Sequence, residues 1–314
     1  MRLTEIDLRS TSSLVRCCCL FAIFLAIGFI ANTSHAQRDS KKKDEEERKP
    51  RRVTLRTKDN LEISCWYAPS DRGKEAVPVL LVHGWKEEGS VWKPMLRTLI
   101  DKNYAVIVPD LRGHGASAVT NPRTKEKIPV DRMTRSQMTM IASRDLETVK
   151  GFIKKENEDE KLNMNALVVI ATEEGTLFAQ NWAMLDWNFP SRGSVKQGQD
   201  VRAMVLLSPA RSLKGYRAEG VFRDQYLYRL PTLIVAGADS DGFGDAKRIY
   251  ERLTNMREKT RFQGENLFLL APDTSLNGVA VVNQMKLQDK VTLFIDNEVV
   301  KPMEDKFPWM SRKK

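Results

Sequence analysis

Histidine is scarce in this sequence: the 314 residues contain only His35, His83 and His114. Histidine is the side chain that most readily takes up and releases protons near neutral pH. Because His35 lies in an N-terminal segment typical of an export signal, only His83 and His114 remain for general-base catalysis. Any function that requires a catalytic imidazole therefore depends on where these two residues lie.

Cysteine is also scarce, with four residues in the chain. Cys17, Cys18 and Cys19 fall in the N-terminal segment, so a processed protein retains Cys65 alone and has no internal disulfide. Cys65 alternates with Ile63 and Tyr67 in an extended pattern. We predict that Cys65 is a small buried core residue.

The first 36 residues have the three parts of a secretory signal peptide: arginines, then an apolar run at 17–31, then the small-residue motif SHA at 34–36. We predict residues 1–36 to be a signal peptide cleaved before Gln37, and the protein to be exported, either periplasmic or secreted. The alternative is an uncleaved membrane anchor. The apolar run is shorter than the roughly 20 residues that span a bilayer. A membrane association is therefore expected only through such an uncleaved signal.

Beyond the signal, the composition predicts three regions. Residues 37–52 (QRDSKKKDEEERKPRR) lack core-forming side chains and are typical of a disordered charged linker. Residues 53–300 suit one α/β domain, and residues 301–314 form a charged C-terminal tail. The formal charge is +10, but acidic residues are interspersed, and no basic aromatic stripe or DNA-binding motif is present. We expect no nucleic-acid partner.

Short β-rich runs alternate with helical segments along residues 53–300, and several runs are apolar on both faces. The predicted strands are 53–57, 61–68, 77–84, 104–110, 166–172, 201–209, 230–237 and 266–272. The predicted helical segments are 91–103, 141–155, 175–185, 245–253 and 283–297. This order predicts an α/β fold with a mainly parallel eight-stranded sheet and helices on both faces.

Three stretches together resemble the α/β-hydrolase family. Residues 79–117 are similar to its third strand, oxyanion loop and first helix, and end in the loop PDLRGHG. Residues 168–176 (VVIATEEGT) resemble its nucleophile elbow, and 230–241 (LPTLIVAGADSD) resemble the strand before the catalytic acid. The resemblance implies an α/β-hydrolase fold. Only about twenty residues separate SPA from LPT, so we expect a minimal lid or none.

The resemblance places Glu173 on the nucleophile position, because the family pattern Gly-x-Ser-x-Gly aligns with residues 171–175 and keeps Gly175. A shift of one residue would make Thr172 the nucleophile instead. Some relatives use a carboxylate on the elbow, but a histidine must then activate the water that hydrolyses the ester. Glu173 alone is therefore insufficient for turnover.

The histidine expected after the last strand is missing, because the sequence there reads DTSLNG and places Asn277 before Gly278. An amide cannot replace imidazole in proton transfer. The acidic position falls on Ser240, with Asp239 and Asp241 on either side, and we assign it to Asp241. The resemblance thus gives a degenerate triad of Glu173, Asp241 and Asn277.

The resemblance also assigns an oxyanion hole to the backbone N–H groups of Trp85, which follows the His83-Gly84 pair, and of Glu174, which follows the nucleophile position, and we count Gly84 among the ligand-binding residues. Backbone donors survive side-chain changes, so we predict a small ligand-binding site there. The Glu173 carboxylate is expected to occupy these donors itself. The stretch DSDGFGD (239–245) does not match an EF-hand, and a turn followed by a helix with Asp245 at its N-cap explains it.

We therefore expect no metal and no cofactor, and interpret the chain as a pseudoenzyme: a non-catalytic binding or scaffolding module with an α/β-hydrolase fold. Its partner would be an unidentified envelope protein or a small ligand. The alternative is an active serine-hydrolase-like esterase or peptidase with an atypical site. A fold alone does not decide between these functions.

Overall fold

The computed structural model describes residues 49–313 except 122–125, 192, 194–195 and 219. The predicted signal peptide and residues 37–48 of the predicted linker lie outside the described residues. The chain divides into two compact units after Lys49, and the unit described below is the second one, Pro50–Lys314. In the part that the structure describes, no helix is both long enough and apolar enough to cross a bilayer.

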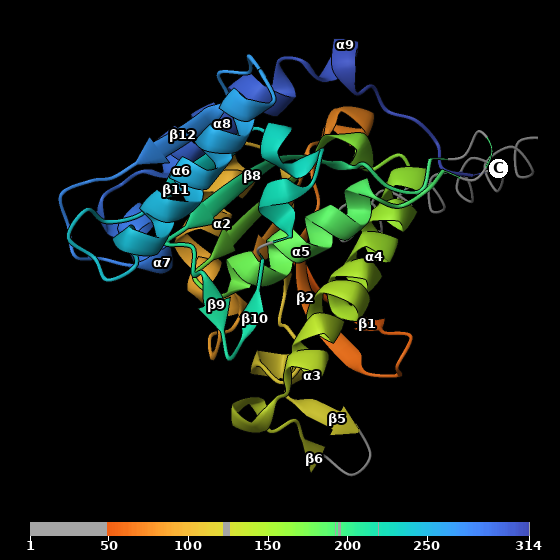
Figure 1. Ribbon diagram of the computed structural model, residues 1–314. Helices are drawn as coiled ribbons and strands as arrows, with labels where there is room; N and C mark the ends of the chain where they lie inside the picture. Colours follow the sequence, from red (N-terminus) through yellow and green to blue (C-terminus); the bar gives the residue numbers. More distant parts are fainter. Residues whose placement is uncertain (1–48, 122–125, 192, 194–195, 219, 314) are drawn as a thin grey trace, which may run out of the picture. The chain divides into compact units, whose positions relative to one another are not determined.

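An eight-stranded sheet forms the centre of this unit, in the spatial order β1-β2-β4-β3-β7-β8-β11-β12 (Figure 1). Its strands are β1 (Arg51–Arg56), β2 (Glu62–Ala68), β3 (Pro78–Val82), β4 (Ala105–Pro109), β7 (Leu167–Thr172), β8 (Val201–Leu207), β11 (Thr232–Val235) and β12 (Leu267–Leu270). The strands from β4 to β12 run parallel, whereas β2 is antiparallel to β1 and β4. All eight predicted strands are present, and the predicted mainly parallel sheet is confirmed.

Helices cover both faces of the sheet. The alternation within β3 shows why, because Val79 and Leu81 enter one core cluster while Leu80 and Val82 enter the other. One face packs against α2 (Lys93–Asp101), α7 (Gly278–Gln284) and α8 (Gln288–Ile295). The other face packs against α4 (Glu147–Glu158), α5 (Gly175–Trp187) and α6 (Phe243–Lys259). Cys65 is buried as predicted, and burial raises the pKa of its thiol.

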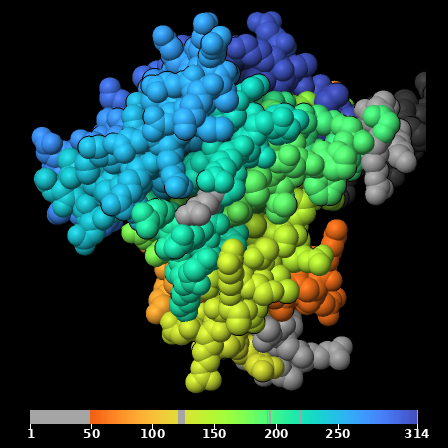
Figure 2. Space-filling model, in the orientation of Figure 1, coloured from red at the N-terminus to blue at the C-terminus, as the bar shows by residue number. Residues whose placement is uncertain are grey.

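Two short excursions interrupt this alternation. Between β4 and α4 lie β5 (Val119–Asn121), β6 (Glu126–Lys127), α3 (Arg135–Met140) and a π-helix (Ile141–Leu146), of which the sequence predicted only helix from 141. Between β8 and β11 lies the hairpin of β9 (Ser212–Leu213) and β10 (Tyr216–Arg217). No α-helix occurs among the described residues of this second connection, in agreement with the expected minimal lid. Figure 2 shows the teal β9–β10 hairpin beside the yellow segment around α3.

Both ends of the domain extend beyond the expected range of 53–300. Strand β1 begins at Arg51, which pairs with Tyr67, so the end of the predicted linker is part of the sheet. After a second π-helix (Asp296–Val300) and α9 (Met303–Lys306), the predicted C-terminal tail packs on the domain and buries Arg312. The ordered part of the chain extends beyond both predicted boundaries, because strand pairing at Arg51 and the ion pair of Arg312 with Asp200 bring charged residues into the fold.

Candidate functional site

The turn between β7 and α5 has the geometry of a nucleophile elbow. Glu173 lies at its tip with a φ of 47°, a left-handed conformation that is costly for a residue other than glycine. Its N–H donates to Leu207 O at 2.8 Å, and its carbonyl accepts from the Ala210 N–H at 3.3 Å. These bonds to the chain beyond β8 hold the strained turn in place.

Gly175 follows directly and lets α5 approach β3 closely. A Cβ atom at this position would lie 2.2 Å from the carbonyl oxygen of His83. No L side chain fits without moving the backbone, so the glycine in the elbow pattern is explained by close packing.

Carboxylates of the chain itself already bind the backbone donors of the neighbouring loop. The Gly84 N–H donates to Glu87 Oε2 at 2.8 Å, and the Trp85 N–H donates to Glu174 Oε2 at 3.2 Å. The sequence predicted that Glu173 would occupy these donors, and this prediction was wrong. The predicted ligand-binding residues Gly84, Trp85 and Glu174 do come together, but with these N–H groups engaged.

Three carboxyl groups therefore surround the elbow. Burial, followed by repulsion from Glu87 and then Glu174, raises the pKa of Glu173 to about 7. Burial also raises the pKa of Glu87, opposed by the hydrogen bond from Gly84 and reinforced by Glu174. The sequence reasoning missed Glu87, although its position three residues after the His83-Gly84 pair was a signal that it lies near the elbow.

We expect Glu173→Gln to stabilise the protein at pH 8 and to have little effect at pH 4.5. The folded-state pKa is raised from 4.5 to about 7, so the folded state binds the proton more tightly and loses stability as pH rises through this interval. Allowing for partial exposure, the gain in unfolding free energy at pH 8 should be about 1–3 kcal/mol. Denaturant unfolding at both pH values measures it.

The matched control for this prediction is Glu304→Gln, which removes one carboxylate from the exposed face of α9. It should leave the slope of stability against pH unchanged. An equal slope in wild type and Glu173→Gln would show that folding does not raise the pKa of the elbow carboxyl.

Neither described histidine is oriented as a catalytic base. His83 is fully buried: its Nδ1 contacts Gly84 O at 2.7 Å, and its Nε2 accepts the Leu111 N–H at 3.0 Å. Burial lowers the pKa of His83 to about 3. His114 is also buried, with Nδ1 2.9 Å from Arg112 O, and burial lowers its pKa too. Backbone contacts thus hold His83 as a neutral ring with both nitrogens engaged.

The loop that carries Asn277 reaches the elbow. A Cβ on Gly278 would lie 3.1 Å from Glu173 Cδ, and the Gly278 N–H donates to Ser208 Oγ at 2.8 Å. Asn277 Oδ1 is buried, with no hydrogen-bond partner among the described residues. The loop of residues 277–278 thus contacts Glu173 through Gly278, whereas the Asn277 side chain lies beside Gly242. Ser208, which sequence reasoning missed, anchors this loop.

Asp241 lies after β11, on the loop that approaches Asn277. A Cβ on the adjacent Gly242 would lie 2.8 Å from Asn277 Oδ1, yet the Asp241 side chain is exposed and has no ion-pair partner among the described residues. The predicted N-cap at Asp245 was wrong. Helix α6 begins at Phe243, and Asp245 in its first turn accepts the Arg211 N–H at 3.2 Å.

Aromatic rings fill the space next to the oxyanion loop. Trp85 contacts His114 edge-on, with ring centroids 4.9 Å apart, and packs near Phe178, which stacks on Tyr216 at 5.4 Å. Over these rings, Asp131 pairs with Lys86 at 2.6 Å and accepts from Lys214 Nζ at 2.6 Å through its carbonyl.

Among the described residues, no group of three or more His, Cys, Asp or Glu side chains is placed to hold a metal ion.

Comparisons with known proteins agree with this architecture. Two curated relatives are non-heme chloroperoxidases: one from Burkholderia pyrrocinia is 44% identical over 63 residues, and one from Kitasatospora aureofaciens is 38% identical over 61 residues. These matches cover 20% and 19% of this chain, and only about a fifth of each relative's length.

Solved structures match over most of the chain. An esterase from Pyrococcus furiosus superposes with a TM-score of 0.58 at 16% identity, covering 82% of this chain and 93% of the esterase. An acylaminoacyl peptidase from Pyrococcus horikoshii superposes with a TM-score of 0.56 at 12% identity, covering 81% of this chain and 42% of the peptidase. At these identities the likeness shows the fold alone.

The family model described as serine aminopeptidase, S33, matches residues 73–236, which is more than half of the chain and includes β3, the oxyanion loop, the elbow and β11. With its eight-stranded sheet and its strand–elbow–helix turn, the protein belongs to the serine aminopeptidase S33 family of α/β hydrolases.

Proposed function

We propose that this chain is an exported α/β-hydrolase-fold protein with a degenerate triad, acting as a non-catalytic binding or scaffolding module. The observation that carries the proposal is the pairing of the Gly84 and Trp85 N–H groups with Glu87 and Glu174. In acyl-transfer enzymes, such donors stabilise the negative charge that develops on the substrate oxygen. Carboxylates already bound there compete for the donors and repel an oxyanion.

The side chains around the elbow support the same proposal. The resemblance places Glu173 on the position of a hydroxyl nucleophile and Asn277, whose amide cannot accept a proton near neutral pH, on the position of the imidazole. His83 is bound through both ring nitrogens, so it is not available as a replacement base. The alternative nucleophile Thr172 is 0% exposed, which keeps its hydroxyl away from any substrate.

Export is proposed from the sequence of residues 1–36. An exported protein has an envelope protein or a small ligand as its expected partner.

The second candidate function is an active esterase or peptidase with an atypical site. Two observations favour this alternative: the elbow backbone at Glu173 is intact, and the chain belongs to a family of hydrolases. The two functions differ in one measurable property, which is turnover of activated esters.

We expect the purified protein, lacking residues 1–36, to hydrolyse p-nitrophenyl esters no faster than buffer. Repair by Glu173→Ser with Asn277→His should give weak hydrolysis. Adding Glu87→Ala and Glu174→Ala, which removes the acceptors from the Gly84 and Trp85 N–H groups, should raise the rate by a further factor of about 10 or more, because each oxyanion donor is typically worth about 10²–10³ in rate. Initial rates under matched conditions test both steps.

The control for the repair is Glu173→Ala with Asn277→Ala, which removes the same side chains and supplies no chemistry. Wild-type turnover that disappears in Glu173→Ala would contradict the proposal and establish the esterase alternative. Labelling of the wild type by a fluorophosphonate probe would have the same consequence, because it requires a reactive hydroxyl.

A further inference from the structure

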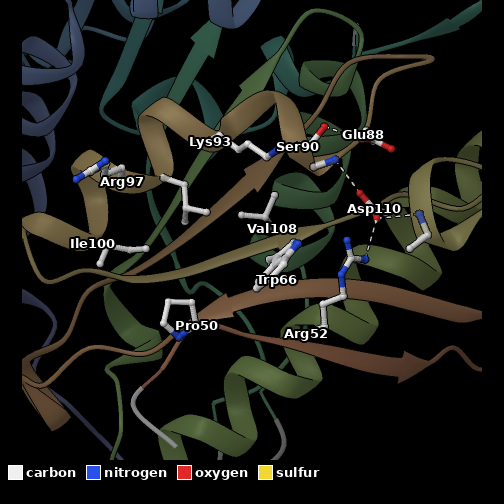
Figure 3. A pocket seen from close by; sticks show the side chains of 13 residues that line it. Pro50, Arg52, Trp66, Glu88, Ser90, Lys93, Arg97, Ile100, Val108 and Asp110 are labelled. Carbon is white, nitrogen blue, oxygen red and sulfur yellow. Dashed lines mark hydrogen bonds and ion pairs between the residues drawn. The ribbon is translucent and has the colours of Figure 1, made fainter. Parts of the chain in front are cut away.

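A cavity of about 530 Å³ lies between α2 and the antiparallel edge of the sheet, lined by residues from β1, β2, β4 and α2 (Figure 3). Its volume falls within the range of about 300–1,000 Å³ that is typical of small-molecule sites. Neither Glu173 nor any other residue of the predicted triad lines it. The cavity is therefore separate from the candidate site at the elbow.

Apolar side chains form the inner surface of this cavity. Trp66, in the middle of β2, pairs in register with Val108 of β4, and both side chains face α2. Leu96 and Ile100, one turn apart on α2, line the opposite wall. Trp66 is 39% exposed, so part of a large aromatic ring remains accessible to a ligand. This surface is suited to an apolar ligand segment.

Cationic side chains border the same cavity. Lys93 and Arg97 lie one turn apart on the exposed side of α2, and neither has an ion-pair or hydrogen-bond partner among the described residues. Arg52 borders the opposite wall, with its guanidinium carbon 5.3 Å from the centre of the Trp66 ring. Like charges one turn apart repel each other, so an anionic group between Lys93 and Arg97 would lower the energy of both.

The acidic residues Glu88 and Asp110 lie on the side of the cavity away from Arg97, and the Lys93 side chain extends toward Ser90 (Figure 3). Asp110 accepts the Gly89 N–H at 2.7 Å and the Ala116 N–H at 2.9 Å, and it lies 3.9 Å from Arg52. Glu88 accepts the Ser90 hydroxyl at 2.6 Å. The charge of Asp110 is thus offset by its own neighbours, whereas the charges of Lys93 and Arg97 are not.

We propose that this cavity binds an elongated amphiphilic carboxylate of the medium-chain fatty-acid type. Its carboxylate would lie between Lys93 and Arg97, and its alkyl chain would cover Trp66 and Val108. The strip of aliphatic side chains along α2 favours an extended chain, and the unpaired cations select a negative head group. The inference does not depend on whether the elbow is inactive.

Isothermal titration of the protein without residues 1–36 with decanoate, below its micelle concentration, tests the proposal. We expect saturable binding with one site, weakened at least tenfold by Trp66→Ala and by Lys93→Glu with Arg97→Glu. The charge-reversed variant should instead bind decyltrimethylammonium more tightly than the wild type does. A gain of this kind cannot come from a loss of folding.

Two matched controls carry the same chemical changes elsewhere: Phe268→Ala removes an exposed aromatic ring, and Lys247→Glu with Lys259→Glu reverses two exposed charges on α6. Both should bind decanoate as the wild type does. Absence of saturable decanoate binding, or equal binding by wild type and the cavity variants, would overturn the proposal. These results are independent of the ester assay, so the two proposals fail separately.

Discussion

Arg312→Ala is expected to lower the free energy of unfolding by about 3 kcal/mol, because it leaves a buried carboxylate without its closest partner. Arg312 is 3% exposed, and its guanidinium pairs with Asp200, which is fully buried. A second guanidinium nitrogen donates to the carbonyl of Lys196 at 3.0 Å. Loss of the side chain removes all of these bonds from the interior.

The remaining cations near Asp200 offset only part of this cost. Lys196 lies 3.2 Å and Lys150 3.5 Å from its carboxylate, but Lys150 also pairs with the buried Asp186 at 2.5 Å. Burial lowers the pKa of Lys196 to about 8, and Asp200 opposes this shift. Repulsion from Arg312 is one of the causes that lower this pKa, so Arg312→Ala should raise the pKa of Lys196 and keep it charged beside Asp200. In the folded wild type Lys196 loses its proton near pH 8 while the unfolded chain still holds it, so the wild type gains stability from pH 7 to pH 9. The variant should gain less, so the stability difference between the two proteins should increase over this interval.

Urea unfolding followed by circular dichroism measures this prediction, with Lys313→Ala as the control. Lys313 is the exposed neighbour, so its removal should change stability by less than about 0.5 kcal/mol. Adding Asp200→Asn to Arg312→Met should recover part of the loss, because neither charge then remains unpaired. Equal stability of wild type and Arg312→Ala would mean that the C-terminal segment does not dock in solution.

Gly175→Ala is expected to cost about 3 kcal/mol of unfolding free energy, through a clash with backbone atoms that cannot move independently. The added Cβ would lie 2.2 Å from His83 O and 2.9 Å from Val82 O, both in the central strand region. Relief requires α5 to move away from β3, which opens the elbow and its packed surroundings. Thermal and urea unfolding should both report the loss.

Gly151→Ala is the matched control for this change. Gly151 lies within α4, and a Cβ there would have no neighbour within 4 Å. Alanine is the better helix former, so this substitution should stabilise by about 0.5–1 kcal/mol. If both substitutions changed stability in the same direction, close packing at the elbow would not explain Gly175.

The sequence by itself determined the fold and the location of the candidate site. Alternating β-rich and helical runs, apolar on both faces in strands such as Val79–Val82, are sufficient to predict a covered parallel sheet. The burial of Cys65 also followed from alternation, and the approach of the loop of residues 277–278 to the elbow followed from the family's chain order. These features depend on local periodicity and on the order of elements, which one sequence contains.

Only the tertiary structure decided which charged groups meet. Glu174 reaches the Trp85 N–H across 89 residues, and Arg312 reaches Asp200 across 112, so no local pattern distinguishes these pairs from other Glu and Arg residues. The same applies to His83. Its two ring nitrogens contact backbone atoms of Gly84 and Leu111, and the position of Leu111 relative to His83 is not evident from the sequence. Electrostatic contacts act between side chains brought together by the fold, and their partners are fixed only once the packing is.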